Sequence, residues 1–132
     1  MKLNTLLALT LVAVVAGCAA KPPRVAQEKV VDVDGVTLKF NGSFDDEKNL
    51  LILSVNNDPV MQGKFPPYTP TQNLKANYKE IELRSHCYFG SVLGNQGGAF
   101  GAIAGIVQSS NNSTADKCEL YVNNELVEHL YF

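Results

Sequence analysis

The sequence predicts a mostly β protein, a small antiparallel sandwich or barrel-like domain of about six strands built around two similar hairpins, with a glycine-rich insertion. Residues 53–65, LSVNNDPVMQGKF, recur without a gap at 120–132 as LYVNNELVEHLYF. Apolar and polar residues alternate over 36–41, a period of two that is typical of a half-buried strand. No crossover helix is evident between the strand-like runs, which favours antiparallel pairing.

The composition indicates one globular domain. The chain has 132 residues, of which 45% are hydrophobic and 18% are charged. Its formal charge of −2 comes from 11 basic and 13 acidic residues that are spread along the chain. Without a basic block to neutralise a run of phosphates, nucleic acid is excluded as a partner.

The first expected strand, 36–44, lies between the turn-like stretches DVDG and FDDEKN. The apolar run LLILSV is followed by two asparagines and then, from residue 60, by VMQGKF, a pattern that is typical of a hairpin. Three assignments of its loop fit the sequence: residues 56–57, residues 57–58 and residues 56–59. Pro59 suits an edge strand or a looser loop.

The hairpin loop decides which side chains face inward. A loop with an even number of residues places one set of apolar residues of each hairpin on a single, core-facing side. That set is Leu51, Leu53, Val55 and Val60 in the first hairpin, and Leu120, Val122 and Val127 in the second. The opposite side is not purely polar, since it carries Ile52, Met61 and Phe65, or Tyr121, Leu130 and Phe132. Both hairpins are therefore expected to be covered on two sides.

The segment between the hairpins begins with a Pro-rich loop at 66–70. It continues as one strand-like run that includes Tyr78, Ile81 and Leu83 and ends at 87–89, although NLKANYKEIEL also fits a turn or more of helix.

The insertion at 90–116 is the unusual part of the chain. Glycines recur every four residues there, a spacing that puts small residues on one side of a helix where another backbone can approach. The segment resembles the glycine-zipper segments of several envelope lipoproteins. The alternative is a flexible loop closed at its base by a disulfide. In both cases the insertion is the candidate contact region, and self-association through it stays open. The residues are Gly97, Phe100, Gly101, Ile103 and Gly105.

The N-terminus has the pattern of an export signal. Lys2 precedes an apolar run of eleven residues, 6–16, which suits a signal peptide, whereas a bilayer span needs about 20. The sequence Val-Ala-Gly-Cys at 15–18 resembles the lipobox of bacterial lipoproteins. That resemblance implies cleavage before Cys18, acyl chains including palmitate on Cys18, and anchoring in the membrane through those chains. Ala19 after the cysteine resembles the pattern for sorting to the outer membrane.

The expected organisation is then a signal peptide at 1–17, a lipidated N-terminus and flexible tether at 18–30, and the β domain at 31–132. With Cys18 lipidated, Cys87 and Cys118 form an even pair in an exported chain, which favours a disulfide between them. The competing interpretation is a metal site that uses His86 and His129, whose spacing fits no ligand pattern. We expect no metal and no cofactor.

No catalytic motif is present. The sequence lacks GxSxG, HExxH and a phosphate-binding GxxxxGK[ST], so we expect no enzymatic activity. The predicted function is a non-enzymatic interaction module of the outer membrane and periplasm that binds an envelope protein and lies on the periplasmic face. The alternative is a small inhibitor or exclusion lipoprotein that blocks an incoming enzyme, toxin or phage.

Overall fold

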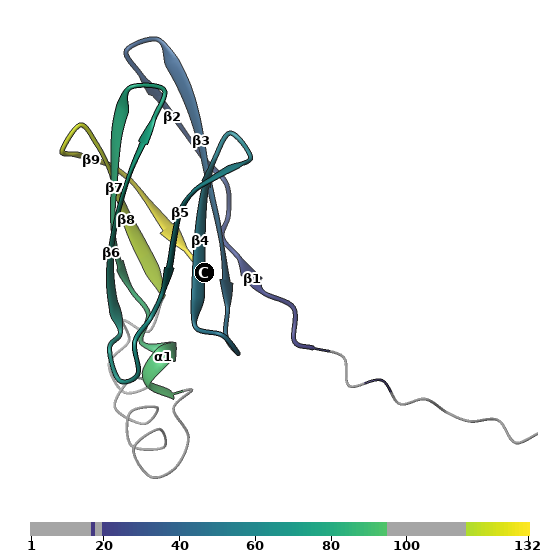
Figure 1. Cartoon of the computed structure of the whole chain (residues 1–132). Helices are drawn as coiled ribbons and strands as arrows, with labels where there is room; N and C mark the ends of the chain where they lie inside the picture. The colour runs from purple at the N-terminus through teal and green to yellow at the C-terminus, as the bar shows by residue number, and fades with distance from the viewer. Residues whose placement is uncertain (1–16, 18–19, 95–115) are drawn as a thin grey trace, which may run out of the picture.

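The computed structural model describes residues 17, 20–94 and 116–132, and the described strands form two antiparallel sheets packed face to face (Figure 1). The first sheet has the order β1-β3-β4-β5, and β2 pairs with β3. Its strands are β1 (Arg24–Val25), β2 (Lys29–Val33), β3 (Val36–Asp45), β4 (Leu50–Val55) and β5 (Asp58–Lys64).

The second sheet has the order β6-β7-β8-β9, so each strand pairs with its sequence neighbour. A short helix, α1, lies between β7 and β8 at the root of the insertion. The elements are β6 (Thr71–Tyr78), β7 (Ile81–Tyr88), α1 (Ser91–Gly94), β8 (Lys117–Val122) and β9 (Glu125–Tyr131). The predicted class, a mostly β sandwich, is confirmed, and the two sheets do not close into a barrel.

The strand count differs from the expected six, because the described residues contain nine strands. Two of the extra strands come from the N-terminal segment, where β1 and part of β2 fall within the expected tether at 18–30. Arg24 pairs with Phe44 and Val25 with Ser43, and Ala26 is buried. The first sheet therefore begins at Arg24, inside the segment 18–30 that was expected to be a flexible tether.

The third extra strand results from a turn that the sequence did not predict. The run expected as one strand is a hairpin, β6 and β7, joined by Lys79 and Glu80. Both residues have positive φ, 46° and 66°, the pattern of a type I′ turn. Lys-Glu is not a typical pair for that turn, so composition gave no signal for it. The helical alternative for this segment is wrong.

The repeated VNN sequence forms two equivalent turns. Asn56 and Asn57 have φ of 51° and 68°, and Asn123 and Asn124 have φ of 49° and 66°, so the two-residue loop is correct for both. The first asparagine of each pair also binds the neighbouring strand. Asn56 N–H donates to the Lys39 carbonyl at 2.9 Å, while its Oδ1 accepts from Lys39 N–H at 3.0 Å.

The second copy repeats this pair of hydrogen bonds. Asn123 N–H donates to the Glu82 carbonyl at 2.9 Å, and its Oδ1 accepts from Glu82 N–H at 3.3 Å. Each repeated asparagine therefore does two things: it adopts the left-handed backbone of the turn and it ties the hairpin to the next strand. This shared role accounts for the presence of the same asparagine pair in both copies of the repeat.

Each repeat also contains a bulge at the same place. The pairing shifts so that Val60 in β5, and Val127 in β9, is the extra residue. Both valines are half buried and pack against the core. Because a bulge shifts the alternation by one residue, Met61, assigned to the opposite side, pairs with Leu53 and is buried. The other predicted core residues of both hairpins are buried as expected, namely Leu51, Leu53, Val55, Leu120 and Val122.

Aromatic rings fill the core at one end of the sandwich. Phe44, Phe65 and Phe89 are buried, and their ring centroids lie 4.4 to 5.7 Å apart. Phe132 adds a fourth ring, 4.9 Å from that of Phe89. Gly42 makes room for it, since a Cβ there would lie 2.7 Å from Cζ of Phe132. These rings seal the end of the domain from which the insertion departs.

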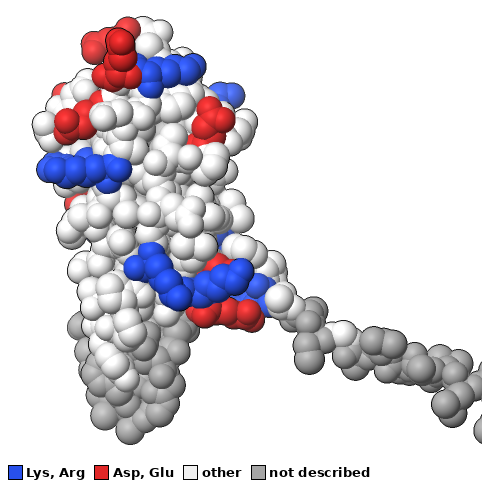
Figure 2. Space-filling view, in the orientation of Figure 1, with Lys and Arg blue, Asp and Glu red and all other residues white. Residues whose placement is uncertain are grey.

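The two ends of the sandwich differ. The chain enters the sheet at Arg24 on the same end as α1, while the four tight turns lie at the opposite end (Figure 1). Each of these turns carries a carboxylate in it or directly after it: Asp34, Asp58, Glu80 and Glu125. Acidic and basic side chains lie next to each other at the top of Figure 2. The end where the chain enters also carries carboxylates, among them Asp46 and Asp116, so both ends of the sandwich have acidic groups.

Candidate binding surface

The outward side of the second sheet carries rows of polar and aromatic side chains that the strand register places next to one another. We call this surface the outer face. Its central row is Asn73, His86, Glu119 and His129, each paired with the next across neighbouring strands. The adjacent rows are Lys75, Arg84, Tyr121 and Leu126 on one side, and Thr71, Tyr88, Lys117 and Tyr131 on the other.

A shallow hollow of about 470 Å³ lies on this outer face. Strand alternation builds it: Leu83, Ser85 and Cys87 of β7 are buried on the core side, so the side chains of Arg84 and His86 between them face outward. The residues that line it come from β6, β7 and β8 and are Asn73, Lys75, Arg84, Ser85, His86 and Tyr121.

A chain of contacts fixes the aromatic wall of the hollow. The Arg84 guanidinium lies over the Tyr121 ring, 4.8 Å from its centroid, in a cation–π contact. The Tyr121 hydroxyl donates a hydrogen bond of 3.0 Å to Oε2 of Glu119. That bond to a carboxylate holds the phenolic proton and raises the pKa of Tyr121 above its ordinary value. Tyr121 is therefore neutral and oriented at physiological pH.

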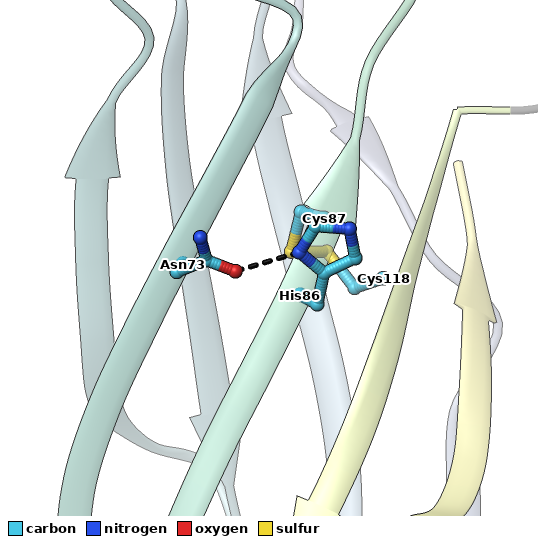
Figure 3. Close-up of a disulfide and its surroundings, with 4 residues drawn as sticks. All are labelled: Asn73, His86, Cys87 and Cys118. Atoms are coloured by element: carbon cyan, nitrogen blue, oxygen red, sulfur yellow. Dashed lines mark hydrogen bonds between the residues drawn. A yellow bond between two sulfur atoms is a disulfide. The ribbon is translucent and has the colours of Figure 1, made fainter.

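Asn73 and His86 form the other wall. They point toward each other from β6 and β7, and Oδ1 of Asn73 lies 2.6 Å from Nδ1 of His86 (Figure 3). Cys87, the next residue along β7, points the other way and is joined to Cys118 of β8, with sulfur atoms 2.08 Å apart. The predicted cysteine pair is thus at disulfide distance. It joins the strands on the core side of the surface that carries the hollow.

The hollow is positively charged on its lining. Lys75 and Arg84 are directly opposite each other on β6 and β7, and no lining residue is acidic. Like charges in opposite positions of an antiparallel pair repel each other. Neither cation forms an ion pair within the described part of the chain. A protein with a net charge of −2 therefore places two cations side by side here, neither with an ion-pair partner, while Glu119 lies in the neighbouring row of the same face.

The outward side of the first sheet differs from the outer face. Its shallow depression of about 180 Å³ is lined by small or uncharged residues from β1, β3 and β4 and from the following turn, namely Val25, Asn41, Gly42, Ser43, Ser54 and Asn57. A depression whose lining has no charged or aromatic group has few means of selecting a ligand. The outer face of the second sheet is therefore the candidate binding surface.

A second cluster of charges lies where the chain enters the domain. The Arg24 guanidinium binds Asp46 at 2.9 Å and Asp116 at 2.7 Å, and it donates to Oγ of Ser91 at 2.9 Å. It also lies 5.1 Å from the Phe44 ring centroid. Burial lowers the pKa of Arg24, but the hydrogen bonds to the two carboxylates outweigh this and leave it raised, so Arg24 stays charged. We call this cluster the Arg24 clamp.

The Arg24 clamp ties three parts of the chain together. Asp116 is the last residue of the insertion and is 3% exposed, and its Oδ1 accepts from the Ser91 amide at 3.2 Å. Ser91 lies at the start of the insertion, in α1. Arg24 therefore links the first strand of the domain to both roots of the insertion.

Several predicted site residues cannot be placed. Cys18 and the candidate contact residues Gly97, Phe100, Gly101, Ile103 and Gly105 lie outside the described residues. His86 and His129, the members of the alternative metal site, both flank Glu119 in register on the outer face. Even so, among residues 20–94 and 116–132 no group of three or more His, Cys, Asp or Glu side chains is arranged to hold a metal ion.

Sequence reasoning missed both the outer face and the Arg24 clamp. The alternation of β7 and β8 carries a signal for the first, since Arg84, His86, Glu119 and Tyr121 occupy the outward positions. The clamp depends on the contacts of Arg24 with Asp46 and Asp116, which are 22 and 92 positions further along the chain, so no local pattern marks it.

Comparisons with protein-family models, with curated proteins and with solved structures gave no match. Within the described ranges, no helix combines the length and the hydropathy required to cross a bilayer.

Proposed function

We propose that this protein is a lipid-anchored, non-enzymatic interaction module of the bacterial outer membrane, with its β domain on the periplasmic face and an envelope protein as its partner. The lipobox-like sequence that ends at Cys18 supplies the anchor. The outer face supplies a surface whose arginine and tyrosines are residue types enriched in protein interfaces.

The observation that carries the proposal is the short link between the expected lipid and the first fixed residue. Arg24 is six positions after Cys18, so a fully extended link reaches about 20 Å. The Arg24 clamp holds that residue at the end of the sandwich that bears the roots of the insertion. A lipid on Cys18 would therefore keep this end near the bilayer and the four tight turns away from it.

This orientation suits both proposed contact surfaces. The insertion, with Gly97, Phe100, Gly101, Ile103 and Gly105 as the proposed contact residues, would leave the domain from its membrane end. The outer face would stand beside the membrane and stay open to a partner in the periplasm. Exposed tyrosines on that face, Tyr88 and Tyr131, are amphipathic groups suited to a protein contact near a lipid surface.

Lipid attachment is tested by metabolic labelling with palmitate. We expect labelled protein from the natural chain and none from Cys18→Ser. Label on Cys18→Ser, or none on the natural chain, would contradict the anchor.

The partner is tested by photocrosslinking in cells. A crosslinker at position 86 on the outer face should capture a resident envelope protein, whereas one at position 37 on the outward side of the first sheet should not. Capture only from position 37 would refute the assignment of the surface. No resident partner, together with protection of the cell against a lytic challenge, would favour the inhibitor alternative. Deleting residues 97–105 tests the insertion: if all crosslinks survive, it is not the contact region.

A further inference from the structure

The hollow on the outer face holds two cations that form no ion pair within the described chain, in a protein that is acidic overall. Arg84 is half buried, Lys75 is exposed, and they face each other on adjacent strands. Pairing two like charges costs stability unless a third group compensates it. The arrangement indicates a ligand that brings negative charge.

We propose that this hollow receives a carboxylate side chain, Asp or Glu, from an acidic segment of a partner protein. The proposal deepens the interaction module proposed above and rests on it for the class of partner. It assigns Arg84 as the residue that binds the carboxylate and Lys75 as the second positive charge.

Arg84 is oriented in advance for this role. Its guanidinium is stacked on the Tyr121 ring, and Tyr121 is itself held by its hydrogen bond to Glu119. Among the described residues, no ion pair or hydrogen bond engages the Arg84 guanidinium, so its donor groups are available to a ligand. A planar guanidinium matches the two oxygens of a carboxylate and can bind both at once. Holding the arginine in place reduces the entropy that binding would otherwise cost.

The surroundings favour a protein segment over a free phosphate or an acidic glycan. Tyr88 and Tyr131 are 36% and 51% exposed in the row on the other side of the central row, and Leu126 is 46% exposed beside Tyr121. Exposed aromatic and aliphatic groups around an arginine are typical of the centre and rim of a protein interface. A small inorganic ion would contact none of them.

The test uses the mature chain from residue 18 carrying Cys18→Ser, with its disulfide intact, and hexaglutamate as the probe. In ¹⁵N NMR titrations we expect amide shifts confined to residues 73–75, 84–86 and 121. Arg84→Gln should weaken binding about tenfold, a loss of about 1.4 kcal/mol, and Lys75→Gln should weaken it less. The matched control is Lys39→Gln, which removes an exposed cation from the first sheet and should change nothing.

Three results would overturn the proposal. Shifts that map to another surface would refute the site, and so would Arg84→Gln binding as well as Lys39→Gln. If inorganic phosphate or an oligogalacturonate binds the hollow while hexaglutamate does not, the ligand is not a protein carboxylate. Because the chain is not lipidated in this experiment, its outcome is independent of the palmitate labelling, and failure of the anchor and failure of the hollow are separate results.

Discussion

Replacing Arg24 with methionine should destabilise the domain through the Arg24 clamp. Methionine keeps an apolar stem over the Phe44 ring but removes the charge that binds Asp46 and Asp116. Asp116 is 3% exposed, so its carboxylate would stay buried without a cation. Breaking a buried ion pair costs about 3 to 5 kcal/mol. The Arg24 side chain is 30% exposed, and screening by water reduces the expected loss to about 2 to 3 kcal/mol.

Urea denaturation of the mature chain measures this loss as a lower midpoint at an unchanged m value. The matched control is Lys21→Met, since Lys21 is 67% exposed and lies 3.8 Å from Asp46. That variant should lose less than about 1 kcal/mol. The double variant Arg24→Met with Asp116→Leu should recover part of the loss, because no buried charge is then left without its partner.

The stabilising role of the Arg24 clamp is refuted if Arg24→Met costs no more than Lys21→Met. It is also refuted if the double variant loses more free energy of unfolding than its two single variants lose together. Either result would mean that Arg24 does not fix the first strand. Without the clamp, the first long strand begins at Lys29, eleven positions after Cys18, and the domain would be free to move further from the membrane.

Three further outcomes follow from the structure. Replacing both Cys87 and Cys118 with alanine should lower the free energy of unfolding by about 3 to 4 kcal/mol in the same denaturation assay, because the unfolded chain regains the freedom of the closed loop; an unchanged midpoint would contradict this. Gly42→Ala should cost about 1 kcal/mol, since the new Cβ lies 2.7 Å from the C-terminal phenylalanine ring; a neutral effect would show that the ring moves freely. Glu119→Gln should lower the pKa of Tyr121 in an absorbance titration, because the carboxylate that holds its proton is gone, and an unshifted titration would count against that hydrogen bond.

The sequence predicted the architecture because the relevant signals are local. The alternation from Val36, the repeated asparagine turns and the absence of a crossover helix are each visible within about ten residues. The pairing of Cys87 with Cys118 was predicted from the even number of cysteines left after Cys18 and from the expected export of the chain. The structure places the two directly opposite each other in β7 and β8.

The errors arose where tertiary contacts override local pattern. The Lys79–Glu80 turn uses residues that rarely favour positive φ, so a hairpin looked like one strand. A bulge at Val60 moved Met61 to the core, and no local pattern marks the position of a bulge. Arg24 looked like part of a tether because its partners, including Asp116, are distant in the sequence.

The depth of single tryptophans in a bilayer tests the central claim, that the insertion end of the domain faces the membrane. The chain contains no tryptophan, and with Cys87 and Cys118 oxidised, Cys18 is the thiol available for coupling to a maleimide lipid in vesicles. Tyr131→Trp reports on the insertion end and Val36→Trp on the turn end, and β3 spans about 26 Å between Val36 and Phe44, the partner of Arg24.

Quenching by a lipid with a headgroup-attached quencher is the measurement. We predict strong quenching of the tryptophan at position 131 and little at position 36. Equal quenching at both positions, or stronger quenching at position 36, would contradict the orientation on which the proposed function rests.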